Sequence, residues 1–209
     1  MSRILITSGP TRQYLDPVRY ISNASSGQMG SCLAQAALDL GHEVVLITGP
    51  VLVEYPKKAK LIEIVTTEEL LEAATSAFKN CDGLIGAAAP CDYRPIKVSD
   101  HKIRKTGEVL ELQFVETPDV VATLGANKRP DQWTVGFALE TEDAHFRAVT
   151  KLQRKSCDLV VLNGTSAINS TNNEVEIIAS GGDVVESASG CKREVANKIL
   201  AVIESRLIK

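Results

Sequence analysis

The chain alternates between short apolar runs and longer segments with helical periodicity. The apolar runs are nearly continuous and cover Ile4–Thr7, Glu43–Thr48, Leu61–Val65, Gly83–Ala88, Thr134–Ala138 and Leu159–Leu162. Continuous runs are typical of strands that are covered on both faces, as in a parallel sheet. The intervening patterns predict helices over Gly27–Leu40, Thr67–Phe78, Asp119–Ala126 and Thr141–Lys155. This alternation predicts an α/β fold with a doubly wound, mostly parallel, Rossmann-like sheet.

Two segments depart from this alternation. Between Pro90 and Thr117 no helical pattern occurs, and the alternating stretch Glu111–Val115 predicts an antiparallel excursion, or flap, that projects from the sheet. Near the end of the chain, Glu174–Ala179 and Asp183–Glu186 predict a hairpin, followed by a helix over Lys192–Leu207. We therefore expect a single domain over residues 1–209 with an excursion at about 90–117.

Composition excludes several classes of protein. The chain has 209 residues, is 44% hydrophobic and 23% charged, and carries a formal net charge of −3, which is not the composition of a disordered chain. Its 23 Lys and Arg residues are outnumbered by 26 Asp and Glu residues, so we expect no nucleic-acid partner. No apolar run approaches the ~20 residues of a membrane span, and we expect no membrane association.

The cysteines and the amino terminus bear on the compartment. Five cysteines are scattered along the chain without a C-x-x-C arrangement, which argues against a disulfide scaffold or a zinc site. Free thiols fit a reducing compartment, and an apolar strand pattern begins at once after Met1, without a signal-peptide pattern. We expect a cytoplasmic protein.

Common active-site motifs are missing from the sequence, but one loop is unusually long. There is no G-x-x-x-x-G-K-[ST], no G-x-S-x-G, no H-E-x-x-H and no G-x-G-x-x-G. Instead, the segment Ser8–Gly27 separates the first strand from its helix. Such connections usually span about two to six residues, and longer ones often carry function.

The residues of this loop fit the binding of an anion. Ser25 or Ser26 can cap the helix, and Gly27 lets a ligand approach the amides of its first turn, which attract phosphate. Arg19 can contact phosphate or carboxylate, and Asn23 has amide donors that can stabilise negative charge on a carbonyl oxygen. An ordinary polar turn with a capping serine explains the same residues.

A series of motifs in register along the chain resembles a known family. The motifs are Gly9–Pro10–Thr11, Asp16–Asn23, Ser25–Ser26–Gly27-x-Met29–Gly30, Ala87–Ala88–Ala89 with Asp92–Tyr93, Lys102–Lys105, Thr117–Val121, Gly136–Thr141, and Lys151 with Lys155 before Asp158–Val160. Together they resemble phosphopantothenoylcysteine synthetase, which also occurs as the C-terminal half of the bacterial bifunctional coenzyme A biosynthesis protein. The flavin-dependent decarboxylase half is absent from this sequence, so we expect a monofunctional synthetase.

The resemblance implies a ligase that joins 4'-phosphopantothenate to L-cysteine. The family activates the carboxylate with a nucleoside triphosphate, releases pyrophosphate, and lets the cysteine amine displace the nucleoside monophosphate from the acyl-nucleotide. It implies CTP as co-substrate, with ATP as the alternative, and Mg²⁺ as the divalent cation; it assigns no metal ligand. Both nucleophiles belong to substrates, so the protein needs only to position reactants and neutralise charge.

The resemblance also implies roles for individual residues. Asn23 and Lys102 are the implied catalytic residues, Asn23 in handling the acyl-nucleotide and Lys102 in forming it. The implied substrate-binding residues are Arg19, Asn23, Ala88 and Ala89. The implied nucleotide-binding residues are Gly9, Ser25, Ser26, Gly27, Asp92, Lys102, Phe137, Lys151 and Lys155. Cys91 has no evident covalent task in such a mechanism.

Other interpretations of the sequence remain open. Lys151 and Lys155 also fit a solvated helix face near a favourable dipole, and Phe137 fits an ordinary core position. The alternative functions are an NAD(P)-dependent or other nucleotide-binding enzyme on a Rossmann-like fold, and a regulatory subunit that binds ligand without turnover.

The excursion suggests an oligomer. Leu110, Leu112, Phe114 and Val115 give it more apolar surface than an isolated two-stranded ribbon can cover. The family resemblance implies dimers built partly through this region. We expect a homodimer in which Lys102–Lys105 lie over an active site of the same or the neighbouring subunit.

Overall fold

A computed structural model describes residues 1–139, 143–164 and 172–208. Within these residues the central sheet has eight strands. In sheet order they are β12 (Val184–Cys191), β11 (Asn172–Ala179), β10 (Leu159–Asn163), β9 (Trp133–Leu139), β6 (Gly83–Gly86), β1 (Arg3–Ser8), β4 (Glu43–Thr48) and β5 (Lys60–Glu63). The strands from β10 to β5 are parallel, whereas β11 is antiparallel to both of its neighbours.

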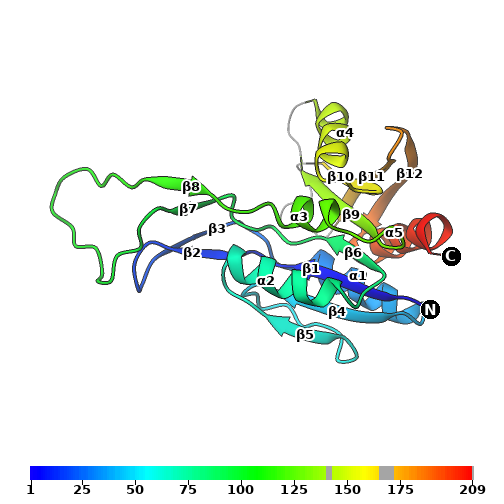
Figure 1. The fold of residues 1–209 in the computed structure, drawn as a ribbon, viewed down its shortest axis with the longest axis horizontal. Helices are drawn as coiled ribbons and strands as arrows, with labels where there is room; N and C mark the ends of the chain where they lie inside the picture. Colours follow the sequence, from blue (N-terminus) through cyan, green and yellow to red (C-terminus); the bar gives the residue numbers. More distant parts are fainter. Residues whose placement is uncertain (140–142, 165–171, 209) are drawn as a thin grey trace.

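Helices cover both faces of this sheet (Figure 1). Helices α1 (Gln28–Asp39) and α5 (Lys192–Leu207) pack on one face in a shared apolar cluster. Helices α2 (Thr67–Phe78), α3 (Val120–Ala126) and α4 (Ala144–Arg154) pack on the other face. The predicted doubly wound, mostly parallel sheet is confirmed. The continuous apolar runs are strands buried on both sides, as in β1, where Ile4, Leu5 and Ile6 are fully buried.

Local signals set several helix ends. Thr66 caps α2 through a capping box, in which its hydroxyl accepts from the Glu69 N–H at 3.1 Å and Glu69 Oε2 accepts from the Thr66 N–H at 3.3 Å. Helix α1 ends at Asp39, and Gly41 follows its C-cap Leu40 with a φ of +83°, which lets the N–H groups of Gly41 and His42 bond to the carbonyls of Leu38 and Ala37. The predicted helix over Thr141–Lys155 is observed from Ala144, and Thr141 lies outside the described residues.

Two short antiparallel ribbons extend away from one end of the sheet (Figure 1). One pairs β2 (Arg12–Tyr14) with β3 (Tyr20–Ser22), and the other pairs β7 (Tyr93–Pro95) with β8 (Phe114–Glu116). The second ribbon is the predicted antiparallel excursion, but its pairing is shorter than the alternation at Glu111–Val115 suggested. The last hydrogen bond of this ribbon joins the Ile96 N–H to the Gln113 carbonyl. Beyond it the two strands separate, because the chain opens into a wide loop (Figure 1).

The hairpin near the carboxyl terminus is longer than predicted. Strand β12 continues to Cys191, well past the predicted end at Glu186, because it stays paired with β11 until α5 begins.

No helix in the described part of the chain is long and apolar enough to cross a membrane.

The strand order creates a crevice beside β1. The chain runs from β1 outward to β4 and β5, then returns to β6 on the other side of β1 and continues outward to β9 and β10. This is the order of the dinucleotide-binding Rossmann fold, in which ligands bind outside the carboxyl ends of the strands where the winding direction reverses. The connections after β1 and β6 therefore define the place to look for a site.

Candidate active site

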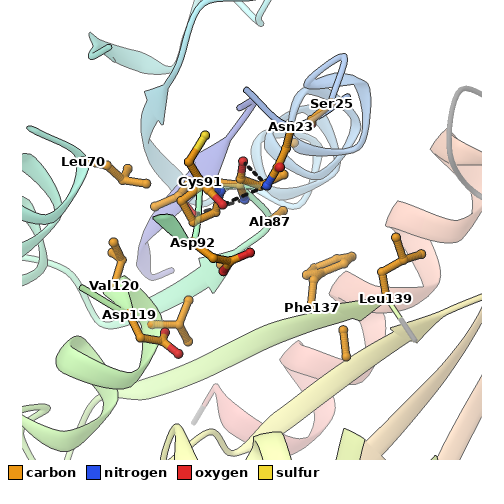
Figure 2. Close-up of a pocket in the computed structure, with 18 of the residues that line it drawn as sticks. Asn23, Ser25, Leu70, Ala87, Cys91, Asp92, Asp119, Val120, Phe137 and Leu139 are labelled. Carbon is orange, nitrogen blue, oxygen red and sulfur yellow. Dashed lines mark hydrogen bonds between the residues drawn. The ribbon is translucent and has the colours of Figure 1, made fainter. Parts of the chain in front are cut away.

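A cavity of about 870 Å³ lies at this reversal point. Its walls are the start of α1, the segment after β6, the turn into α3, the carboxyl end of β9 and the end of α4. The lining residues are 23–30, 86–93, 116–122 and 137–139, together with Thr7, Leu70, Lys151, Arg154, Lys155, Asn163, Asn173 and Lys192. Its volume falls within the roughly 300–1,000 Å³ of typical ligand sites. Figure 2 shows Phe137 and Leu139 on one side of the cavity and Asn23 with Cys91 on the other.

The first turn of α1 forms one wall, but its cap differs from the prediction. Gly27, with a φ of +73°, is the N-cap, and no side chain caps the helix. The hydroxyls of Ser25 and Ser26 accept long hydrogen bonds of 3.4 Å from the N–H groups of Gly27 and Gln28, two residues on, but neither serine is the N-cap. The predicted serine cap is therefore wrong. A Cβ at Gly27 would lie 2.7 Å from the Tyr55 hydroxyl, so close packing and a left-handed turn set this helix start.

The Asn23 side chain is already engaged by backbone groups. Its Nδ2 donates to the Pro90 carbonyl at 2.9 Å and to the Ala89 carbonyl at 3.4 Å (Figure 2). Nδ2 is thus engaged by two backbone carbonyls, and Oδ1 is left as the atom that can accept a bond from a ligand. This differs from the prediction, which had the amide donors facing negative charge on the ligand.

Cys91 anchors the loop that carries Ala88 and Ala89. Its N–H donates to Thr11 Oγ1 at 2.8 Å, and its carbonyl accepts from the hydroxyls of Thr117 at 2.6 Å and Thr67 at 3.2 Å. Burial raises the pKa of the Cys91 thiol. A buried, protonated thiol suits a structural role rather than a covalent one. The sequence showed no task for this residue, because its partners are up to 80 positions away.

The wall opposite Asn23 combines an aromatic ring with unsatisfied acceptors. Phe137 projects from β9 into the cavity (Figure 2). The side-chain oxygens of Asn163 and Asn173 are buried and accept no hydrogen bond from the described residues. Such oxygens suit the N–H donors of a ligand, because a buried acceptor without a partner is costly. Neither asparagine was predicted from the sequence, because a lone asparagine near a strand end gives no signal of this kind.

Three cations from the last turn of α4 and its C-cap lie along another edge of the cavity. They are Lys151 and Lys155, which were predicted, and Arg154, which was not. Lys155 Nζ lies 3.1 Å from Oδ2 of Asp119, and Arg154 Nη2 lies 3.7 Å from the same oxygen. The carboxylates of Asp92, Glu116 and Asp119 also line the cavity, although no three metal-ligating side chains cluster among the described residues.

Arg19 and the segment of Lys102 meet outside this cavity. Arg19 Nη1 donates to Asp16 Oδ2 at 2.8 Å and to the Ile103 carbonyl at 3.0 Å. Burial acts to raise the pKa of the Asp16 carboxyl, but bonds from the N–H groups of Val18, Ile103 and Arg19 outweigh it and lower the pKa. Among the described residues, neither Arg19 nor Lys102 lines the cavity.

Gly9 does not line the cavity, but its backbone contacts Ala89, which does. Its carbonyl accepts the Ala89 N–H at 2.9 Å, and a parallel bridge joins Pro10 to Ala89. The remaining predicted residues all lie in the lining; they are Asn23, Ser25, Ser26, Gly27, Ala88, Ala89, Asp92, Phe137, Lys151 and Lys155.

Comparisons with known proteins agree with this architecture. The family model of the DNA/pantothenate metabolism flavoprotein C-terminal domain matches residues 1–207. The coenzyme A biosynthesis bifunctional protein CoaBC of Vibrio vulnificus is 40% identical over 186 residues, which are 86% of this chain and 46% of that protein. CoaBC of Escherichia coli is 40% identical over 189 residues, 87% of this chain and 47% of that protein. The chain thus spans about half the length of these curated relatives.

A solved structure is similar over nearly the whole chain. The crystal structure of the C-terminal domain of CoaBC superposes with a TM-score of 0.84 at 36% identity and covers 98% of this chain and 95% of that one.

Proposed function

The chain belongs to the DNA/pantothenate metabolism flavoprotein C-terminal domain family, and on that premise we propose that it is a phosphopantothenate–cysteine ligase of coenzyme A biosynthesis. One observation carries the proposal. A single cavity at the reversal point of the sheet combines a helix start, an aromatic wall and a row of cations, and ten of the residues that the motifs predicted line it.

The reaction has two steps. The carboxylate of phosphopantothenate attacks the α-phosphorus of a nucleoside triphosphate, and the bond to the β-phosphate breaks to release pyrophosphate. The amine of cysteine then attacks the acyl carbon, loses a proton, and expels the nucleoside monophosphate. Neither step requires a nucleophile from the protein, which fits a cavity built from amides, cations and carboxylates.

The triphosphate is placed beside Lys151, Lys155 and the first turn of α1, where positive charge and backbone N–H groups meet it. The base is placed against Phe137, with the oxygens of Asn163 and Asn173 as acceptors for an exocyclic amino group. Cytosine and adenine both carry such a group, so these acceptors fit either base. CTP is the proposed co-substrate because the family resemblance implies it, and ATP is the alternative.

The residues of the cavity fit a magnesium ion bound with the triphosphate. Mg²⁺ is usually held by one or two carboxylates together with substrate phosphates, and Asp92 and Glu116 are carboxylates in the lining. When bound, the ion would neutralise charge on the phosphates and on the departing pyrophosphate.

Asn23 serves the second step in this proposal. Its Nδ2 holds the carbonyls of Ala89 and Pro90, and its Oδ1 accepts an N–H of the incoming cysteine amine. An aspartate at this position cannot donate to the two carbonyls, and its charge repels them. The acyl-nucleotide would still form in Asn23→Asp but would be consumed slowly.

Lys102, on the excursion, and Arg19, in the connection between β2 and β3, act in a homodimer in this proposal. The tip exposes apolar side chains, with Val109 88% and Leu110 58% exposed, and a second copy of this chain would cover them. Because Lys102 and Arg19 both lie outside the cavity of their own chain, we propose that the excursion and the β2–β3 ribbon, joined by the bond from Arg19 to the Ile103 carbonyl, bring them to the cavity of the partner subunit.

The five free cysteines support a reducing compartment such as the cytoplasm.

A pyrophosphate-release assay tests the proposal. The purified protein is supplied with phosphopantothenate, cysteine, Mg²⁺ and each triphosphate in turn, and we expect release with CTP. Turnover without any triphosphate, or tight binding of a nicotinamide dinucleotide instead, would overturn it. Mass spectrometry should detect the acyl-nucleotide in Asn23→Asp and not in Lys102→Gln, and equal accumulation in both would refute the division of roles.

A further inference from the structure

A carboxylate lies among the cations proposed to bind the triphosphate. Asp119 lines the cavity together with Lys155 and Arg154, and Figure 2 shows it beside Val120 at the start of α3. An anion next to a polyanionic ligand weakens binding by repulsion, so its presence requires a compensating role.

Hydrogen bonds hold the Asp119 carboxylate in place. Oδ1 caps α3 by accepting a hydrogen bond from the Ala122 N–H at 3.1 Å. The backbone carbonyl of Asp119 accepts a hydrogen bond from the Thr123 hydroxyl at 2.8 Å. Oδ2 is therefore directed away from the helix, where Lys155 Nζ lies 3.1 Å away and Arg154 Nη2 lies 3.7 Å away. One oxygen builds the helix end and the other holds the cations.

Close packing of two helix ends brings these residues together. A Cβ at Gly125 would lie 2.1 Å from the Lys155 carbonyl oxygen, so α3 contacts the end of α4 at this glycine. The side chain of Lys155 is only 19% exposed, whereas that of Arg154 is 68% exposed. Of these two cations, Lys155 is thus the more confined by packing, and its ammonium lies beside Asp119 Oδ2.

We propose that Asp119 is a positioning residue that holds the ammonium of Lys155 at the cavity edge, ready for the triphosphate. The inference rests on the proposed function, because it takes a nucleoside triphosphate as the ligand. A lysine side chain has four flexible bonds, and ordering it on binding weakens affinity. Holding it beforehand removes that loss, and Lys155 itself offsets the charge of Asp119.

Neutral capping variants test this role. Asp119→Asn and Asp119→Ser both keep an N-cap side chain and remove the charge. We expect each to raise the KM for CTP by about two- to tenfold, the loss expected from ordering one long side chain, with kcat little changed. Asp131→Asn is the matched control, because it breaks an ion pair of the same 3.1 Å length, to Arg129, away from the cavity. It should change neither constant.

Repeating the substitution at Asp119 in the Lys155→Gln variant shows whether Asp119 positions Lys155 or only supports the fold. In Lys155→Gln, Asp119 has no ammonium to hold and only repels the ligand, so Asp119→Asn should there lower the KM for CTP. A rise of the KM by the same factor in both backgrounds would overturn the inference. So would an increased Mg²⁺ requirement in Asp119→Asn, which would make the carboxylate a metal ligand instead.

Calorimetry with a non-hydrolysable CTP analogue distinguishes the two levels of the proposal. If the unmodified protein binds no triphosphate, the proposed function fails and this inference fails with it. If it binds the analogue and Asp119→Asn binds equally well, the inference alone fails.

Discussion

Replacing Gly30 by alanine should impair both the fold and the site. Gly30 lies in the first turn of α1 and faces Ser8 at the end of β1. A Cβ at Gly30 would lie 2.1 Å from Ser8 Oγ and 2.4 Å from Ser8 Cβ. The hydroxyl can rotate, but the Cβ of Ser8 cannot move without its strand. Since carbon atoms pack best at about 3.5–4.0 Å, the first turn of α1 must shift by about 1 Å.

The cost in stability is modest because two effects oppose each other. Alanine favours a helix interior over glycine by about 1 kcal/mol. Against this stand about 1–3 kcal/mol for overpacking and about 1 kcal/mol for the bond from Ser8 Oγ to the Gly27 carbonyl, which now spans 3.1 Å. We expect the free energy of unfolding, measured by urea denaturation, to fall by about 1–3 kcal/mol.

Activity should fall as well, because the shifted turn moves Gly27, which lines the cavity. A displacement of about 1 Å at a reacting site can cost on the order of 100-fold in rate. We expect kcat/KM for CTP in the pyrophosphate-release assay to fall by about ten- to a hundredfold.

A compensating substitution at Ser8 tests whether the steric clash with the new Cβ causes these losses. Ser8→Gly removes both clashing atoms and leaves only the Ser8 Cα, at 3.3 Å from the new Cβ. The double variant should therefore be more active than the product of the two single effects. Wild-type kcat/KM in Gly30→Ala, or strictly multiplicative losses in the double variant, would refute the steric argument.

Three further predictions follow from other parts of the molecule. Thr11→Val removes the acceptor of the buried Cys91 N–H and should lower the free energy of unfolding by about 1–3 kcal/mol in urea; an unchanged midpoint would contradict this. Burial raises the pKa of the Cys157 thiol from 9.0 to about 11, so its stabilising contribution is complete below pH 9 and is lost as the pH rises through 11. Cys157→Ala should reduce the pH dependence of unfolding in that interval, and an identical dependence would argue against it. Leu112→Asp combined with Phe114→Asp should shift sedimentation toward monomer and reduce activity, whereas a fully active monomer of the unmodified protein would exclude the proposed dimer.

Local patterns in the sequence were sufficient for much of the fold. The bounds of β4, α2 and α5 match the prediction, because continuous apolar runs and helical periodicity are properties of neighbouring residues. The parallel sheet with helices on both faces follows from the same alternation. The motifs also named most residues that line the cavity, since a family likeness needs no contacts to be recognised.

Interactions between distant residues decided the rest. The amide of Asn23 donates to carbonyls 66 and 67 positions away, and the Tyr55 hydroxyl leaves no room for a Cβ at Gly27, the N-cap of α1. Asp119 meets Lys155 only because two helix ends pack at a glycine. Arg19 is drawn to Ile103 on the excursion and away from the cavity of its own chain. Each of these contacts joins residues from different helices, strands or loops. The local sequence pattern forms those elements, but only tertiary packing decides which of their side chains and backbone groups meet.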